Sequence, residues 1–290
     1  MKDALRLLGY FGAVVLAGAL VAPPLYWGAQ RLAGHEPFNF LGQFDFEVFF
    51  DRALLIAALA FLWPLLRSLG VRRVSDLGLR SNTHPWRDLG GGFVAALVPL
   101  ILCAAILVAT HVYLMRATPA LTPIGRTIAA AIAVPFIEES FFRGLVLGVL
   151  LRNGRKYLAM LFTSALFSVV HFLKAPEGTS PVVTWASGFQ SIAHSFAQFS
   201  DPILVLAGFT TLFLIGWILA DARLRTASLW LPIGLHSGWI FGNGVFSRIA
   251  RREVLMLPWL GRNLLIGLIP LAVVSVSWLL IRVWKREETA

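Results

Sequence analysis

The sequence predicts an all-α membrane protein, a polytopic transmembrane bundle of about eight helices. Of its 290 residues 58% are hydrophobic and only 14% are charged, whereas a soluble chain is roughly 45–50% apolar. Apolar stretches also recur along the whole chain, each near the roughly 20 residues that a helix needs to cross a bilayer. We find no linker and no internal repeat, so we expect a single integral membrane domain over residues 1–290.

Eight stretches are long and apolar enough to be spanning helices, two of them only marginally. The first follows Lys2 and Arg6, as a secretory signal would, but it is longer and lacks a small-residue cleavage site, so we expect it to be retained. The eight predicted helices cover residues 7–28, 47–66, 89–114, 124–151, 157–173, 202–220, 228–247 and 263–282.

The positive charges carry information on membrane topology. The net charge of +10 comes from Lys and Arg residues at the ends of the apolar stretches rather than in a stripe, which argues against nucleic-acid binding. The larger share falls on the side of the N-terminus, so we expect a multi-pass protein of the plasma (cell inner) membrane with both termini cytoplasmic. Arg248, Arg251 and Arg252 contradict this bias: either one span is miscounted, or this loop folds back on the protein.

The loop 174–201 contains an aromatic stripe. Its members recur at spacings of four and three, as on one face of a helix. We therefore expect an amphipathic helix here, lying in the membrane interface or across the mouth of the bundle; an ordinary packing helix is the alternative. The stripe consists of Trp185, Phe189, Ile192, Phe196 and Phe199.

Ionisable residues inside predicted spans identify the candidate site, because each costs roughly 2.5–3.5 kcal/mol at the centre of a membrane helix. The fourth span holds two carboxylates and a guanidinium, the fifth ends in an imidazole, and the seventh carries another imidazole and an amide. The residues are Glu138, Glu139, Arg143, His171, His236 and Asn243.

Helical geometry separates the two carboxylates. Glu139 and Arg143 are four residues apart and can form a buried ion pair. Glu138 points about 100° away from Glu139, which leaves it free to face a polar cavity. His171 lies at a similar depth to Glu138, and His236 lies shallower unless its helix tilts. The alternative is that all these charges form one structural network that holds the bundle together.

A carboxylate with two imidazoles suits the activation of water for attack on a carbonyl group. A desolvated glutamate can act as general base, an imidazole can orient the water, and a second imidazole with an amide can stabilise the oxyanion. Glu138, His171 and His236 are equally a possible catalytic zinc set with an open position for water. The residues alone leave both chemistries open.

These residues resemble the CAAX-protease and bacteriocin-processing family of intramembrane peptidases, which includes the Ras-converting prenyl endopeptidases. The family pattern of Glu-Glu-x-x-x-Arg, Phe-x-x-x-His and a later His is matched by Glu138, Glu139 and Arg143, by Phe167 and His171, and by His236. The likeness covers mainly 124–247. One departure is Ile240, where the family often has Asn or Asp four residues after the last His; Asn243 is the nearest amide.

The resemblance implies a general base at Glu138 with His171, an oxyanion role for His236, and a structural role for Glu139 with Arg143. It also implies a peptide or prenylated protein substrate, with membrane lipids as the other partners and no nucleic acid. We favour a metal-free glutamate mechanism, with one zinc ion as the alternative. The rival function is a non-catalytic membrane scaffold or transporter component with a buried charge network.

Overall fold

The protein is almost entirely helical, as predicted. The computed structural model describes residues 2–72, 77, 83–118, 124–152, 154–172, 182–254, 258–261 and 267–287, and these divide into two compact units. The first unit contains residues 1–72 and 173–201, and the second contains residues 73–172 and 202–290. The site predicted from the sequence lies wholly in the second unit.

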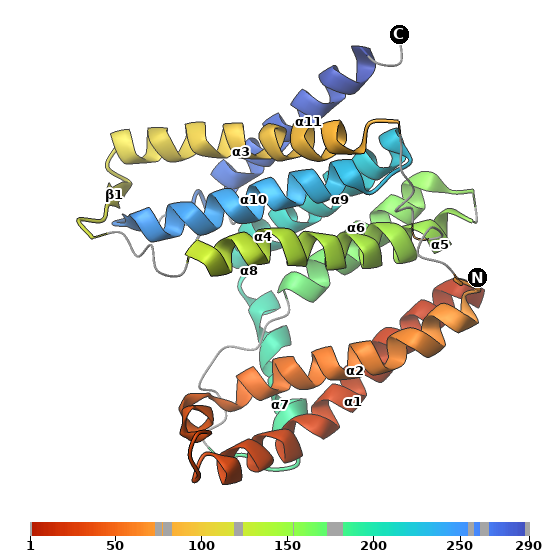
Figure 1. Ribbon diagram of the computed structural model, residues 1–290, viewed down its shortest axis with the longest axis vertical. Coiled ribbons are helices and arrows are strands. Elements are labelled where there is room, and N and C mark those ends of the chain that lie inside the picture. The colour runs from red at the N-terminus through yellow and green to blue at the C-terminus, as the bar shows by residue number, and fades with distance from the viewer. Residues whose placement is uncertain are drawn as a thin grey trace. The chain divides into compact units, whose positions relative to one another are not determined.

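The first unit is a helical hairpin with a third helix against it. Helix α1 (Lys2–Leu32) and helix α2 (Phe46–Ser68) flank the short 3₁₀ helix η1 (Asn39–Gln43), and the long pair lies side by side in Figure 1. Small and aromatic side chains fill their interface, among them Ala19, Ala22 and Phe50.

Helix α7 (Ser187–Ala197), followed by the 3₁₀ turn η4 (Gln198–Ser200), confirms the helix predicted in the 174–201 loop; residues 174–181 lie outside the described residues. Its buried face is made of small residues, and a side chain at Gly188 would overlap the backbone of Ala19 on α1. The aromatic side chains Phe189 and Phe196 are exposed. An apolar exposed face suits a membrane environment. The placement of α7 in the membrane interface stays a prediction.

The second unit is built around helix α10 (Trp230–Ile249). Figure 1 shows α10 between α3 (Pro85–Ala109) and α4 (Ile124–Glu139), and all three run side by side. Glycines allow the close approach of α3 and α10: a Cβ at Gly234 would lie 2.1 Å from the carbonyl oxygen of Leu89. Small residues at such crossings let membrane helices pack through their backbones.

The remaining helices of this unit pack around that centre, α6 and α11 against α9, and α11 also against α3. The chain continues from α4 through a π-helical turn η3 into α5, and from α8 through a second π-helical turn η5 into α9. Their bounds are η3 Ser140–Val146, α5 Leu147–Leu151, α6 Lys156–Phe172, α8 Pro202–Leu204, η5 Val205–Phe209, α9 Thr210–Thr226 and α11 Leu268–Glu287.

Each of the eight predicted stretches contains a helix where the structure describes it. Among the described residues, four helical segments are long and apolar enough to cross a membrane, and α6 and α11 are shorter apolar helices. Many large hydrophobic side chains are exposed, among them Leu59, Ile132 and Leu279. Soluble monomers rarely expose apolar surface of this extent. The chain is thus a helical membrane protein.

The predicted end of the third span at residue 114 is wrong. Helix α3 ends at Ala109, and the chain then forms strand β1 (Tyr113–Met115), which pairs antiparallel with β2 (Ala250–Arg252). A strand of three residues has no hydropathy pattern of its own, so hydropathy could not distinguish it from the end of the apolar run.

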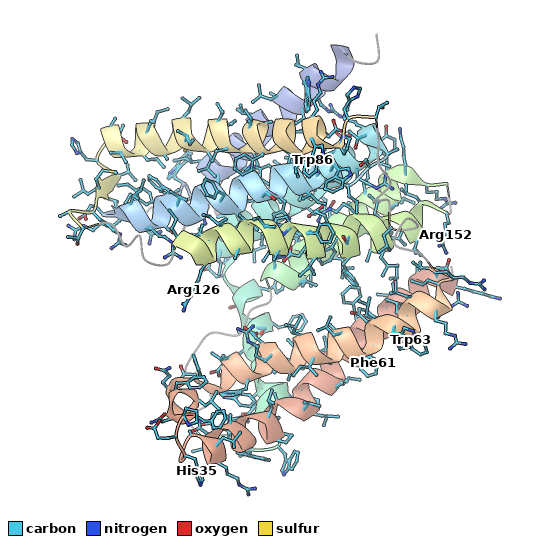
Figure 2. The ribbon with its side chains drawn as sticks, in the orientation of Figure 1. His35, Phe61, Trp63, Trp86, Arg126 and Arg152 are labelled. Carbon is cyan, nitrogen blue, oxygen red and sulfur yellow. The ribbon has the colours of Figure 1, made fainter. Side chains whose placement is uncertain are left out.

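The basic cluster at the end of α10 and in β2 folds back on the protein, which is the second of the two alternatives that its charge raised. Arg248 donates to Thr127 at the start of α4 over 2.8 Å, Arg251 pairs with Glu253, and Arg252 donates to the Gly261 carbonyl. Figure 2 labels Arg126 at this end of α4 and Arg152, beyond α5, at the other.

Candidate active site

The two adjacent carboxylates that end α4 have different surroundings. The side chain of Glu139 is completely buried, whereas that of Glu138 is 25% exposed. This difference follows from their 100° separation round the helix, as predicted. The π-helical turn η3 begins at the next residue and includes Arg143; such turns often accompany functional sites.

Arg143 neutralises Glu139 inside the bundle. Its Nη1 donates to Glu139 Oε1 over 2.9 Å, and both side chains are fully buried. Its Nη2 donates to the carbonyl oxygen of Gly216 on α9, and its Cζ lies 4.4 Å from the ring centroid of Phe167 on α6. The predicted intrahelical pair is therefore present, and the contacts of Arg143 connect it to α9 and α6.

His236 joins the same carboxylate from α10. Its Nδ1 lies 2.8 Å from Glu139 Oε1, the oxygen that also accepts from Arg143. A carboxylate paired with a guanidinium is an acceptor, so the proton is on Nδ1 and His236 donates. Glu139 thereby fixes the ring of His236, a link that the sequence interpretation did not include.

His171 is held by its own helix. Its Nδ1 lies 2.8 Å from the carbonyl oxygen of Phe167, which only accepts, so Nδ1 carries a proton. The opposite ring atom, Nε2, lies 3.1 Å from Glu138 Oε2. The Phe167 ring packs against the imidazole with 4.1 Å between centroids, and this contact completes the orientation of His171.

Glu138, His171 and His236 meet around one oxygen atom. Glu138 Oε2 lies 3.1 Å from Nε2 of His171 and 3.9 Å from Nε2 of His236. The predicted depths of Glu138 and His171 agree with this contact, and α10 brings His236 to the same level. Glu138 and His171 are each about a quarter exposed, so the meeting point is accessible to small molecules.

Asn243 lies seven residues beyond His236 on α10, half-buried on the same side of the helix. Seven residues correspond to roughly 10 Å along the axis. Its part in the site therefore stays a prediction.

Whether Glu138, His171 and His236 bind a metal ion stays a prediction. Across the described ranges, no three His, Cys, Asp or Glu side chains are grouped to hold a metal ion.

Sequence reasoning missed one member of the site, the backbone carbonyl of Gly216, to which Arg143 donates. Gly216 packs closely against Ser164 on α6. A glycine in an apolar span can indicate close helix packing, but no sequence signal identifies a carbonyl oxygen as a partner.

Comparison with known proteins adds a family to this geometry. Residues 119–242 match the model of the family described as type II CAAX prenyl endopeptidase Rce1-like. Searches of curated proteins and of solved structures find no significant match. The matched range includes Glu138, Glu139, Arg143, His171 and His236. The match supports a membrane protease, and it confirms over residues 119–242 the predicted resemblance to the CAAX-protease and bacteriocin-processing family.

Proposed function

We propose that the protein is an intramembrane endopeptidase that hydrolyses a peptide bond in a membrane-associated, lipidated or small peptide through water activated by Glu138. The observation that carries this proposal is the convergence of two imidazole Nε2 atoms on Glu138 Oε2. A partly exposed carboxylate between two imidazoles is arranged to move protons. A purely structural network would bury all its charges, as Glu139 and Arg143 are buried.

Charge balance supports a single transferable proton at this point. Glu139 and Arg143 cancel, so Glu138 remains as one net negative charge. One additional proton shared among Glu138, His171 and His236 makes the cluster neutral, which is the favoured state in surroundings of low polarity. Since both Nδ1 atoms already carry protons, this proton lies on Glu138 or on an Nε2 atom.

The proposed reaction uses each group once. With Glu138 ionised, its carboxylate takes a proton from a water molecule that His171 helps to orient, and the hydroxide attacks the carbonyl carbon of the substrate. His236, protonated at Nε2 and supported by Glu139, donates to the oxyanion. Glu138 then passes its proton to the amine nitrogen as the C–N bond breaks, so one water and one peptide bond yield one carboxylic acid and one amine.

The surroundings suit a substrate that approaches from the membrane. Ile137 and Val170, the sequence neighbours of Glu138 and His171, have large exposed apolar side chains. A lipid chain attached to the peptide can rest on such side chains while the peptide bond reaches Glu138. The family description, a prenyl endopeptidase, points to a prenylated peptide as the first substrate to test.

The proposal includes a plasma-membrane location with both termini cytoplasmic, which the distribution of Lys and Arg supports. It includes no metal, which is the mechanism that we favour over one zinc ion held by Glu138, His171 and His236. The rival, a scaffold or transporter component, is favoured by no specific contact among the described residues.

The decisive experiment is cleavage of a fluorogenic farnesylated peptide by the purified full chain in detergent. Glu138→Gln keeps the size of the side chain but cannot accept the proton, so we expect turnover to be lost while the thermal unfolding midpoint stays close to that of the parent. Glu253→Gln, which changes the exposed pair with Arg251, is the matched control and should keep full turnover. Turnover that survives Glu138→Gln would rule out the peptidase proposal.

A further inference from the structure

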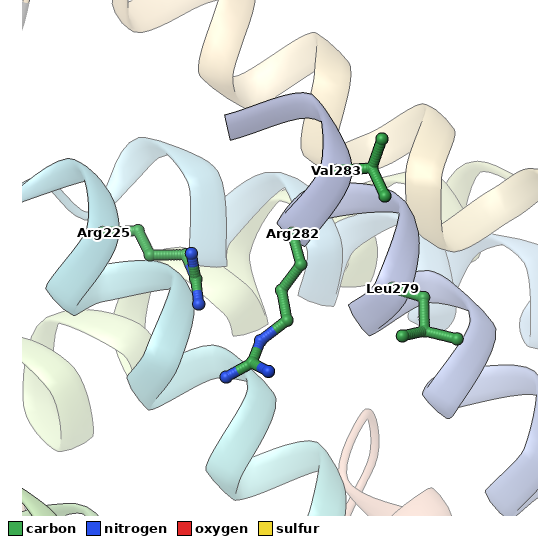
Figure 3. A pocket seen from close by; sticks show the side chains of 4 residues that line it. All are labelled: Arg225, Leu279, Arg282 and Val283. Atoms are coloured by element: carbon green, nitrogen blue, oxygen red, sulfur yellow. The ribbon is translucent and has the colours of Figure 1, made fainter. Parts of the chain in front are cut away.

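Two adjacent cavities lie where α6, α9 and α11 meet, in the second unit. Their volumes are about 380 and 290 Å³. Figure 3 shows Arg225 and Arg282 reaching toward each other between α9 and α11 beside the larger one. The larger is lined by Arg225, Leu279, Arg282 and Val283, and the smaller by Lys156, Tyr157, Met160, Asp221, Leu224, Arg225 and Arg282.

One carboxylate organises the cations of these cavities. Asp221 Oδ2 accepts from Arg225 Nε over 2.9 Å and from Arg282 Nε over 3.5 Å, and Trp278 Nε1 donates to it over 2.8 Å. Both guanidinium groups donate to Asp221 through Nε. Their terminal nitrogens can therefore donate to a ligand in the cavity. With Lys156 the lining carries three positive charges against one negative charge.

The cationic lining continues into an exposed apolar surface. Leu279 and Val283 on α11 are 58% and 60% exposed. The Arg282 guanidinium lies 4.2 Å from the centroid of the Trp278 ring, which fixes its direction. Fixed positive groups beside exposed aliphatic side chains match the two parts of a phospholipid, the phosphate and the acyl chain.

The position along the helices is that of a lipid headgroup. Arg225 is in the last turn of α9, Lys156 begins α6, and Arg282 is close to the end of α11. Tyr157 is exposed at the same level. Basic and aromatic side chains at helix ends mark the boundary between the hydrocarbon and the headgroups. On the predicted topology this boundary is the cytoplasmic one, where anionic lipids attract basic residues.

This site is separate from the candidate active site. Lys156 and His171 occupy opposite ends of α6, fifteen residues apart, which corresponds to roughly 22 Å along the axis. The inference therefore does not depend on the proposed peptidase activity.

We propose that Arg225, Arg282 and Lys156 bind the phosphate of an anionic phospholipid whose acyl chain lies along Leu279 and Val283. The bound lipid bridges α6, α9 and α11. The shared chemistry, a phosphate on two guanidinium groups, also describes inorganic phosphate, and the experiment separates the two sources.

The test measures the thermal unfolding midpoint and the lipid retained in native mass spectra for the full chain in neutral detergent. The probes are phosphatidylglycerol, phosphatidylcholine with the same acyl chains, and inorganic phosphate. We expect phosphatidylglycerol alone to raise the midpoint and to remain bound. An equal effect of phosphatidylcholine or of inorganic phosphate would overturn the assignment to an anionic lipid.

Two pairs of variants locate the effect. Arg282→Gln should weaken phosphatidylglycerol binding about fivefold, the factor that corresponds to the roughly 1 kcal/mol typical of one basic residue at an anionic membrane surface. Arg126→Gln, exposed at the other end of the unit, should leave it unchanged. Leu279→Glu, which leaves the Asp221 contacts in place, places a negative charge beside the acyl chain and should abolish retention. Leu279→Gln has a side chain of the same size and shape as glutamate without the charge, and it should preserve retention. Retention by Leu279→Glu, or equal loss in both Leu279 variants, would refute the site.

Discussion

His236 donates its Nδ1 proton to the oxygen of Glu139 that also accepts from Arg143, over 2.8 and 2.9 Å. One buried oxygen thus connects the ion pair of the α4–η3 segment to an imidazole on α10. Glu139 is a positioning residue in this arrangement, because its carboxylate, whose charge Arg143 balances, orients the ring of His236.

Removing one member of the buried pair should destabilise the protein. Glu139→Gln leaves the Arg143 guanidinium without its counter-charge, and we expect a loss of about 3–5 kcal/mol. Arg143→Met leaves the Glu139 carboxylate without its counter-charge, and we expect a similar loss of stability. Thermal unfolding in detergent measures both.

The double variant Glu139→Gln with Arg143→Met provides the control. It removes both charges together, so its loss of stability should be clearly smaller than the sum of the two single losses. Losses that simply add would show that the two side chains do not act as a pair.

His236→Ala tests the oxyanion role. The oxyanion exists only near the transition state, so kcat should fall by about 10²–10³, while KM changes little. Steady-state kinetics on the farnesylated peptide separate the two constants. His35→Ala, at an exposed position in the first unit, should leave both unchanged. A rise in KM at constant kcat would instead assign His236 to substrate binding.

The sequence predicted the helices well and singled out the polar residues that lie inside them, because both depend on local patterns. Apolar runs of membrane length predict helices, and charges inside such runs need partners, so Glu138, Glu139 and Arg143 were recognisable at once. The contacts between helices were less accessible. The bond from His236 to Glu139 depends on the rotation of α10, and the bond from Arg143 to Gly216 depends on a backbone carbonyl. Neither leaves a trace in hydropathy or spacing, and the same is true of the β1–β2 pairing.

Metal removal tests the proposed glutamate mechanism. Because the proposed reaction uses Glu138 and no metal ion, we expect cleavage to survive dialysis against a strong zinc chelator. Elemental analysis of the active protein should then find zinc far below one ion per chain. If activity disappears on chelation and returns with added zinc, the zinc set of Glu138, His171 and His236 is the correct interpretation.

The close packing of α3 and α10 makes a prediction about the backbone that carries His236. A methyl group at Gly234 would lie 2.1 Å from the carbonyl oxygen of Leu89, so Gly234→Ala must push the two helices apart. We expect a loss of stability of about 1–3 kcal/mol, as for other overpacked interiors. His236 is two residues away, and its 3.9 Å approach to Glu138 should lengthen, so turnover should fall as well.

Gly148→Ala is the matched control. A methyl group at Gly148, inside α5, would contact nothing within 4 Å. It should leave turnover unchanged and raise stability by about 0.5–1 kcal/mol, because alanine loses less conformational freedom in a helix than glycine does. Equal behaviour of the two variants would mean that α3 and α10 are not in backbone contact at Gly234. The position of His236 would then need another explanation.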